Sequence, residues 1–269
     1  MTATLQLLAA VEALADEAAA LILEVYATDF AVLGKADASP VTVADERAEA
    51  HLVAGLRLLT PGVPVVAEEA VSRGEVPAVA GRFWLVDPLD GTREFVSRNG
   101  EFTVNIALVE RGEPVLGVVQ VPVQRRRYAG LVGQGAWCDD AEGRRAIGCR
   151  AVPAAGELML ASSRSHGDGA ALQGWLVAQG LAGRPLRHRP VGSSLKFGLL
   201  ACGEADLYPR LGRTMEWDTA AGQAVLRAAG GDVHTLDGAP LRYGKPGFEN
   251  PHFVASGRGG VPAPRGKPA

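Results

Sequence analysis

Two aspartates, Asp87 and Asp90, lie close together in the segment WLVDPLDGT, which spans residues 84–92. The apolar run at residues 83–86 stops at Asp87, and such a run is typical of a buried strand. The Pro-Leu pair between the aspartates turns the chain so that both carboxylates can face one point. Two carboxylates held that close repel each other unless positive charge lies between them. Because hard divalent cations prefer oxygen ligands, this spacing predicts a Mg²⁺ site.

The residues that follow Asp90 suit an anion beside that cation. Gly91 has no side chain, so its backbone can approach a ligand closely. If a helix begins at Thr92, the free N–H groups of its first turn favour a phosphate. The alternative is an ordinary turn at Asp90 and Gly91, with Asp87 as a strand cap. The apolar strand directly before the pair favours the metal and phosphate interpretation.

Two further acidic positions resemble Asp87 in their setting. Glu68 comes directly after a short apolar stretch at residues 64–67, and Asp218 opens an apolar helical stretch within WDTAAG at residues 217–222. Alone, Glu68 reads as a solvated strand edge and Asp218 as a helix cap. Taken together with Asp87 and Asp90, they supply enough carboxylate for two Mg²⁺ ions. Two such ions form the arrangement used for in-line phosphoryl displacement.

The first half of the chain reads as helices packed on an antiparallel sheet. Apolar residues recur at helical spacing over residues 5–25, and a second helix ends before Thr60-Pro61-Gly62. Strand-like segments follow at residues 64–67, 83–86, 103–109, 115–121 and 128–132. The three arginines at residues 125–127 read as a solvated hairpin turn rather than as a nucleic-acid patch.

The second half alternates strands with helices, which suggests an α/β unit. Strands are expected at residues 158–161 and 206–211, and helices at residues 168–179, 194–202 and 218–229. Ser193 is expected to cap the helix at residues 194–202. A boundary between the two parts is placed near residues 150–156. The Gly-, Pro- and Arg-rich tail from Gly257 is expected to be disordered.

Composition excludes several classes of protein. The chain has 269 residues with 27 Lys and Arg against 30 Asp and Glu, a formal net charge of −3. That balance argues against an electrostatic nucleic-acid binder. Three scattered cysteines make neither a disulfide framework nor a zinc site. No apolar run of about 18 residues and no basic leader are present, so a cytoplasmic protein is expected.

Several longer runs carry a resemblance that covers residues 5–254. The chain resembles the Mg²⁺-dependent, lithium-sensitive phosphatases of the inositol monophosphatase superfamily, most of all its bacterial 3'(2'),5'-bisphosphate nucleotidases of sulfate assimilation. The DPLDGT and WDTAAG runs are typical of the superfamily, and the RNGEFTVN, GSSLKF and LYPR runs are typical of the nucleotidase branch. The remaining matching runs are SPVTVAD (39–45), VVAEEA (65–70) and SRSH (163–166).

The resemblance implies a layered α-β-α-β-α fold of the sugar-phosphatase type and a site that holds two or three Mg²⁺ ions. The implied metal ligands are Glu68, Asp87, Asp90, Asp218 and the backbone carbonyl of Leu89. The implied catalytic residues are Asp45, Glu68 and Thr92. Thr92, helped by Asp45, would orient a water activated by the metal. The amides of Gly91 and Thr92 would hold the phosphate that is cleaved.

A bisphosphate substrate also needs a second phosphate site, away from the metals. The resemblance places Lys196 and Arg210 there, with Ser193 as a hydroxyl donor, and cationic side chains suit a phosphate that the metals do not reach. Ser165 and His166 would contact the nucleoside. The alternative is that Lys196 is merely exposed and that Arg210 pairs with Asp206 or Glu204.

The implied activity is hydrolysis of the 3'-phosphate of 3'-phosphoadenosine 5'-phosphate, or of its 5'-phosphosulfate analogue, to give AMP in the first case. Inositol monophosphatase or fructose-1,6-bisphosphatase activity is the alternative within the superfamily, and a catalytically idle regulatory protein is the alternative outside it. The chain would act on a small molecule, without nucleic acid or membrane, as a monomer or homodimer. Residues 1–150 would carry the metal site and residues 151–256 the second-phosphate and nucleoside contacts.

Overall fold

The computed structural model describes residues 3–28, 32–34, 40–163 and 169–261. The helices are α1 (Leu5–Tyr26), α2 (Val43–Leu59), α3 (Glu68–Ser72), α4 (Thr92–Val96), α5 (Gly169–Ala178), α6 (Leu195–Ala201), α7 (Ala220–Ala228) and the 3₁₀ turn η1 (Pro246–Phe248). The strands are β1 (Val32–Gly34), β2 (Pro40–Thr42), β3 (Val65–Ala67), β4 (Arg82–Asp90), β5 (Thr103–Glu110), β6 (Glu113–Val121), β7 (Arg126–Leu131), β8 (Gly135–Asp140), β9 (Gly143–Ile147), β10 (Leu158–Ser162), β11 (Leu186–Pro190), β12 (Leu207–Arg210), β13 (Asp232–Thr235) and β14 (Phe253–Ser256).

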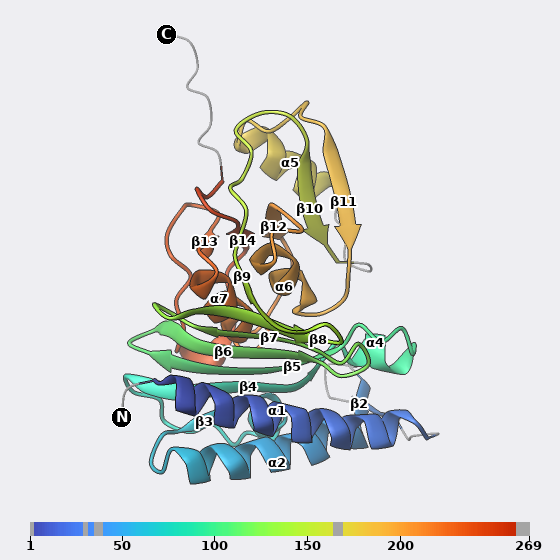
Figure 1. The fold of residues 1–269 in the computed structure, drawn as a ribbon, viewed down its shortest axis with the longest axis vertical. Coiled ribbons are helices and arrows are strands. Elements are labelled where there is room, and N and C mark those ends of the chain that lie inside the picture. The colour runs from blue at the N-terminus through green and yellow to red at the C-terminus, as the bar shows by residue number, and fades with distance from the viewer. Residues whose placement is uncertain (1–2, 29–31, 35–39, 164–168, 262–269) are drawn as a thin grey trace.

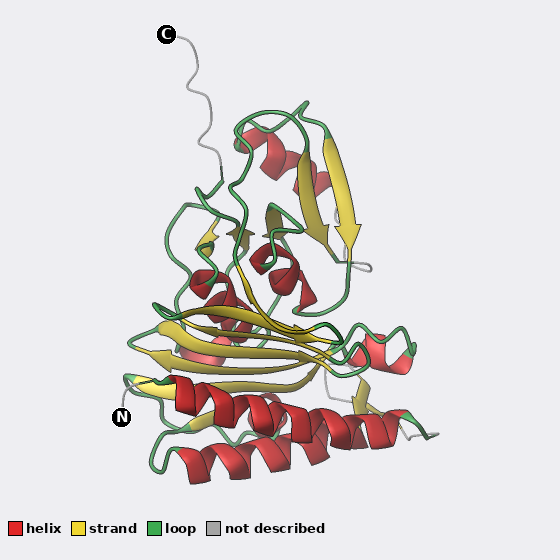
Figure 2. Ribbon diagram, in the orientation of Figure 1, coloured by secondary structure: helices red, strands yellow, loops and turns green. Residues whose placement is uncertain are grey.

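These elements stack in five layers (Figures 1 and 2). Helices α1 and α2 cover one face of a seven-stranded sheet, and α6 and α7 cover its other face. A five-stranded sheet lies beyond α6 and α7, and α5 covers its outer face. The layered α-β-α-β-α fold expected from the sequence is therefore confirmed. No helix among the described residues is long and apolar enough to cross a membrane.

The seven-stranded sheet has the order β3-β4-β5-β6-β7-β8-β9. Its strands pair antiparallel as predicted, except that β3 runs parallel to β4. In that parallel pair Ala67 lies opposite Val86. The next residues along the two strands, Glu68 and Asp87, therefore lie side by side, Glu68 directly after the end of β3 and Asp87 within β4. The parallel pairing, which the sequence did not reveal, is what brings two of the predicted metal ligands together.

Helix α7 is held unusually close to the seven-stranded sheet by two glycines that face each other on β6 and β7, Gly117 and Gly130. A Cβ atom on Gly117 would lie 2.3 Å from the backbone oxygen of Ala221, and one on Gly130 would lie 2.6 Å from the Cα atom of Val225. Side chains at these positions would force α7 away from the sheet. Because Asp218 lies just before α7, the two glycines also fix where that carboxylate sits.

The five-stranded sheet has the order β11-β10-β12-β14-β13. Strand β10 pairs parallel with β11 and β12, whereas β14 pairs antiparallel with β12 and β13. Trp175 and Leu176 of α5 pack on the outer face of this sheet with Leu158, Leu160 and Leu207. The predicted α/β unit is thus a mixed sheet, and it delivers Arg210 at the end of β12. The two sheets fall on either side of the predicted boundary near residues 150–156, and the division into domains stays a prediction.

Several predicted helix boundaries are wrong. Helix α7 begins at Ala220 rather than at Asp218, because Thr219 occupies the N-cap position. Helix α6 has Ser194 rather than Ser193 at its N-cap, and the Ser194 side chain makes no capping hydrogen bond. The two side chains predicted at these helix starts have other partners: Asp218 Oδ2 accepts from the Met215 N–H at 2.8 Å, and Ser193 Oγ donates to the Asp90 carbonyl at 2.8 Å.

The arginines at residues 125–127 are not a solvated turn throughout. Arg127 lies in β7 with its side chain only 15% exposed, and it pairs with Asp16 and Asp139. Glu12 of α1, 9% exposed, pairs at 2.9 Å with Arg144 of β9. These ion pairs join α1 to the far strands of the sheet. The arginines therefore help to hold the helix against the sheet.

The prediction of a disordered tail from Gly257 is wrong for residues 257–261. The Arg258 N–H donates to the Arg150 carbonyl at 3.0 Å, and Val152 N–H donates to the Arg258 carbonyl at 2.9 Å. Residues 257–261 therefore continue the ordered chain, while residues 262–269 lie outside the described part.

Gly117→Ala should lower the free energy of unfolding by about 1–3 kcal/mol, because the added methyl group meets backbone of α7 that cannot move aside cheaply. Gly174→Ala in α5 is the matched control, since a Cβ atom there meets nothing within 4 Å. It should raise stability by roughly 0.5–1 kcal/mol, the usual gain from replacing glycine inside a helix. Chemical denaturation of both variants tests this. Equal stability of Gly117→Ala and the wild type would contradict the close approach of α7.

Candidate active site

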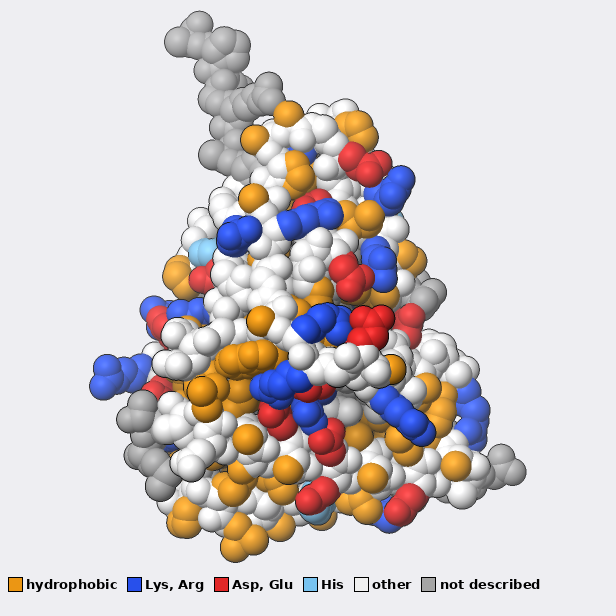
Figure 3. Space-filling view, in the orientation of Figure 1, with side chains coloured by type: hydrophobic (Ala, Val, Ile, Leu, Met, Phe, Trp, Pro, Cys, Tyr) orange, Lys and Arg blue, Asp and Glu red, His pale blue; other side chains and the backbone are white. Residues whose placement is uncertain are grey.

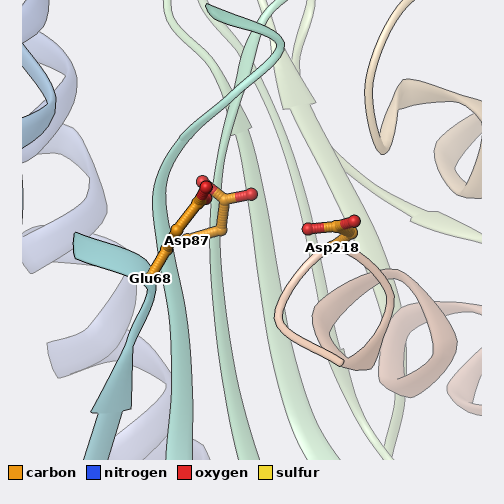
Figure 4. A group of neighbouring side chains, drawn as sticks. All are labelled: Glu68, Asp87 and Asp218. Atoms are coloured by element: carbon orange, nitrogen blue, oxygen red, sulfur yellow. The ribbon is translucent and has the colours of Figure 1, made fainter. Parts of the chain in front are cut away.

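Three carboxylates meet at one edge of the seven-stranded sheet (Figure 4). Glu68, Asp87 and Asp218 each offer one carboxylate oxygen, and these oxygens all lie within 4.8 Å of one another. Glu68 is the first residue of α3, directly after β3, and Asp87 lies on the parallel strand β4. Asp218 faces them from the loop before α7. The three predicted ligands, far apart in sequence, are thus brought to one point.

The electrostatics of this cluster call for a cation. Asp87 is 1% exposed. Burial raises its pKa well above the usual value, and the charges of Glu68, Asp90, Asp218 and Asp45 raise it further. Burial likewise raises the pKa of Asp218, with the charges of Asp90 and Glu68 adding to the effect. A divalent cation would remove this repulsion, and an all-oxygen donor set matches Mg²⁺. The residues present therefore fit the metal.

Asp90 lies outside the group of three but is held close to it. The pairing of β4 with β5 shifts register between Asp87 and Asp90, and the Leu89 N–H donates to Asp87 Oδ1 at 3.0 Å. This irregularity replaces the simple Pro-Leu turn expected from the sequence, since β4 continues to Asp90. Leu89 is 1% exposed as a whole and contributes to the wall of the cleft described below.

Gly91 and Thr92 form the entry to helix α4. Gly91 has a φ of 95°, in the left-handed region, and α4 begins at Thr92 as expected. A Cβ atom on Gly91 would lie 2.1 Å from Ser193 Oγ. The close approach predicted at Gly91 is therefore to the chain's own Ser193. Asp45, in the first turn of α2, is 1% exposed and lies near enough to Asp87 for its charge to raise the pKa of Asp87.

A cleft of about 680 Å³ collects these groups. Every predicted site residue that the structure describes lines it, apart from the buried Asp45: Glu68, Asp87, Leu89, Asp90, Gly91, Thr92, Ser193, Lys196, Arg210 and Asp218. The cleft therefore draws on both parts of the chain. Ser165 and His166 lie outside the described residues.

Lys196 and Arg210 bring positive charge to the side of the cleft formed by the C-terminal part. Lys196 is 4% exposed, its Nζ donates to the Val191 carbonyl at 3.2 Å, and burial lowers its pKa to about 8. Arg210 donates to Ser163 Oγ at 3.1 Å and to the Arg213 carbonyl at 2.9 Å. Among the described residues neither cation forms an ion pair with a carboxylate.

The alternative readings of these two cations are therefore wrong. Lys196 is buried rather than exposed. Asp206 pairs with Arg150 at 2.6 Å, and Glu204 pairs with Arg189 at 3.0 Å, so neither acid is the partner of Arg210. The Nε atom of Arg210 is buried and has no hydrogen-bond partner among the described residues. An unsatisfied donor of this kind is open to an anion.

Three residues of the site were missed by sequence reasoning: Thr103, Asn105 and Ser194. All three have a side-chain atom within hydrogen-bond distance of Asp90 Oδ2. The shortest contacts come from Ser194, whose N–H donates at 2.6 Å and whose Oγ lies at 2.8 Å. Asn105 stands in the otherwise apolar part of strand β5 and is 1% exposed. A buried amide must find partners. A polar residue within an apolar strand was therefore the signal that could have identified Asn105.

Without divalent cations, the raised pKa values of Asp87 and Asp218 should make folding stability fall as the pH rises. A carboxyl whose pKa is higher in the folded protein stabilises it below the ordinary pKa, and this contribution is lost as the pH rises through the folded value. Mg²⁺ should therefore raise the melting temperature more at pH 8 than at pH 5.5. Asp87→Asn should shrink this difference. Thermal melts with and without Mg²⁺ test it, and a Mg²⁺ effect independent of pH would contradict it.

Comparison with known proteins covers nearly the whole chain. The model of the inositol monophosphatase family matches residues 4–263. The 3'(2'),5'-bisphosphate nucleotidase CysQ of Escherichia coli K12 is 47% identical over 248 residues, which cover 90% of this chain and 96% of that protein. The corresponding protein of Haemophilus influenzae is 33% identical and covers 83% of this chain and 82% of its own length.

Solved structures agree with these matches. The crystal structure of CysQ from Bacteroides thetaiotaomicron aligns with a TM-score of 0.78 and 36% identity, over 93% of this chain and 97% of that one. An inositol monophosphatase from Zymomonas mobilis aligns with a TM-score of 0.76 and 27% identity, over 97% and 96% of the two chains. With the acidic cluster and the layered fold described above, these matches show that the chain belongs to the inositol monophosphatase family.

Proposed function

We propose that this chain is a Mg²⁺-dependent 3'(2'),5'-bisphosphate nucleotidase that hydrolyses the 3'-phosphate of 3'-phosphoadenosine 5'-phosphate to give AMP. The analogue with a 5'-phosphosulfate group is a second substrate. One observation carries this choice within the family: the cleft holds an acidic cluster on one side and, on the other, two cations that lack a carboxylate partner among the described residues. The names of the bacterial relatives support the same activity.

The metal side consists of Glu68, Asp87, Asp90, Asp218 and the Leu89 carbonyl, all of which line the cleft. When bound there, Mg²⁺ ions neutralise these carboxylates and supply Lewis-acid charge for phosphate hydrolysis. The chain's own part is to hold these oxygens in place before substrate arrives. The Gly117 and Gly130 contacts with α7 and the parallel pairing of β3 with β4 do this.

Thr92 and Asp45 act on the attacking water. Thr92 lines the cleft at the start of α4, where its hydroxyl orients this water. Asp45, buried in the first turn of α2, helps Thr92 in this role. Glu68 shares this side of the cleft and helps to hold the water. The amides of Gly91 and Thr92 hold the phosphate that is cleaved.

Lys196 and Arg210 bind the second phosphate. A buried ammonium group such as that of Lys196 loses its hydration, so it gains most from a dianionic ligand. The buried Nε of Arg210 gains a hydrogen-bond acceptor at the same time. The Ser193 hydroxyl has one proton and donates it to the Asp90 carbonyl at 2.8 Å, so the donor role expected for it at the second phosphate is wrong for this arrangement.

Inositol or fructose phosphatase activity would use the same metal side, so only the second-phosphate side distinguishes these alternatives. A catalytically idle protein is disfavoured by the cluster itself. Carboxylates that raise one another's pKa in a buried site destabilise the fold when no cation is bound. A binding protein without catalysis has no physical need for them.

The substrate preference tests the proposal directly. With Mg²⁺, the wild type should release phosphate from 3'-phosphoadenosine 5'-phosphate in strong preference to inositol 1-phosphate and fructose 1,6-bisphosphate. Lys196→Ala should lower kcat/KM for the nucleotide by roughly 10- to 100-fold, the value of a charge-assisted hydrogen bond. Its effect on inositol 1-phosphate should stay within about threefold, because that substrate lacks the second phosphate.

Arg189→Ala removes a cation that does not line the cleft and is 50% exposed, and it is the matched control. Its kcat/KM values should equal those of the wild type. Equal losses for both substrates in Lys196→Ala, or a wild type that prefers inositol 1-phosphate, would reject the assignment of the second-phosphate site.

The pH dependence of binding provides a second test. The pKa of Lys196 is lowered to about 8 by burial, so the side chain is charged below pH 8 and loses its charge above it. KM for the bisphosphate should therefore rise above pH 8, by at most about tenfold per pH unit. KM for inositol 1-phosphate should lack this rise. Lys196→Arg should abolish it, since arginine stays protonated. Parallel rises for both substrates, measured from pH 7 to 10, would contradict the role of Lys196.

A further inference from the structure

We propose that Ser194 is a positioning residue that fixes the Asp90 carboxylate for the metal and ties the second-phosphate helix α6 to it. Binding of Mg²⁺ and of the nucleotide 5'-phosphate would then favour each other. The proposal rests on the proposed function for the identity of the nucleotide. Its metal part stands on the site geometry alone.

The first observation is the conformation of Ser194 at the start of α6. Ser194 directly precedes α6 and already has helical backbone angles, with a φ of −70° and a ψ of −3°, and its side chain makes no capping hydrogen bond. A serine that caps a helix normally has extended backbone angles. The Ser194 hydroxyl is therefore available to partners outside the helix.

Those partners belong to both implied metal ligands on this side of the cleft. Ser194 Oγ lies 2.8 Å from Asp90 Oδ2 and 2.5 Å from the Asp218 carbonyl oxygen, and the Ser194 N–H donates to Asp90 Oδ2 at 2.6 Å. Asn105 Nδ2 donates to Ser194 Oγ at 3.0 Å. With a donor already on its oxygen, the hydroxyl directs its own proton to one of the two acceptors.

The orientation of Asp90 follows from these contacts. Within the described residues, every hydrogen bond to the Asp90 carboxylate falls on Oδ2. The other oxygen, Oδ1, is thereby left for a cation. Ser194 is 2% exposed, so water cannot readily replace its hydroxyl. Without that hydroxyl, the Asp90 carboxylate would keep fewer donors and would rotate more freely.

The same contacts join the two halves of the cleft. Lys196 lies in the first turn of α6, two residues after Ser194, and Ser193 Oγ donates to the backbone carbonyl of Asp90. The start of α6 is thus attached to Asp90 through both serines. Any adjustment of Asp90 on binding a cation is passed to Lys196. By linkage, a phosphate that fixes Lys196 must favour the cation to the same degree.

The test measures metal binding without turnover. Titration calorimetry with Mg²⁺ alone should show Ser194→Ala binding Mg²⁺ about 10-fold more weakly than the wild type, or weaker still, as is usual when a residue that orients a ligand is removed. Ser256→Ala is the matched control, because Ser256 is also 2% exposed but lies in β14 and does not line the cleft. Its Mg²⁺ affinity should be that of the wild type. Ser194→Thr, which keeps the hydroxyl, should recover most of the affinity.

A second titration measures the coupling, with AMP as the probe because it carries the 5'-phosphate and is not a substrate. The wild type should bind AMP more tightly with Mg²⁺ than without it, and Ser194→Ala should lose most of that gain. Wild-type protein that binds Mg²⁺ but not AMP would reject the proposed function and leave the positioning of Asp90 standing. Unchanged Mg²⁺ affinity in Ser194→Ala would reject the positioning role even if the wild type turns over the nucleotide.

Circular dichroism shows whether Ser194→Ala is folded. If it is not, Asn105→Ala serves instead, since Asn105 Nδ2 donates to both Ser194 Oγ and Asp90 Oδ2. It should weaken Mg²⁺ binding in the same direction. Wild-type affinity in a folded Asn105→Ala variant would overturn the proposal.

Discussion

Repulsion among like charges is the constraint on which the rest of this structure depends. Glu68, Asp87 and Asp218 come within 4.8 Å of one another from three separate segments. The contacts within such a cluster are repulsive, so the rest of the fold must hold the three acids in place. The parallel pairing of β3 and β4 imposes the position of two of the acids. The close packing of α7 on the sheet imposes the position of the third.

The opposite side of the cleft holds buried positive groups that lack an anionic partner among the described residues. Lys196 is a buried cation, and the buried Nε of Arg210 has no hydrogen-bond partner there. Acids and cations share one cavity without pairing directly in the described residues, and Ser193 and Ser194 stand between them. Figure 3 shows a different pattern on the outer face that it displays, where acidic and basic side chains are interspersed. Acidic and basic side chains are thus separated within the cleft, unlike on this outer face. A substrate with two phosphates matches this arrangement, with one phosphate on the metal side and the other on the side of the cations.

Much of this site could be predicted from sequence because its acids directly follow apolar strands, as Glu68 and Asp87 do. The predictions that failed were those that depend on which strands and which side chains pair in the folded protein. Nothing local indicates that β3 runs parallel to β4, or that Arg127 pairs with acids on α1 and β8. Ser194 was overlooked in favour of Ser193 because both are plausible caps, and only the fold shows that the Ser194 hydroxyl is the one beside the Asp90 carboxylate. The roles given to Asp45, Thr92 and the metal ligands stay predictions.

The paired glycines of β6 and β7 have a consequence for how this protein tolerates change. Gly117 and Gly130 have no functional groups and do not line the cleft, yet they set how near Asp218 comes to Glu68 and Asp87. A random mutagenesis screen scored on activity would therefore recover substitutions at two chemically silent positions. Such variants would keep every metal ligand and still hold the ligands too far apart. The residues that set the distance between the ligands are therefore different from the ligands themselves.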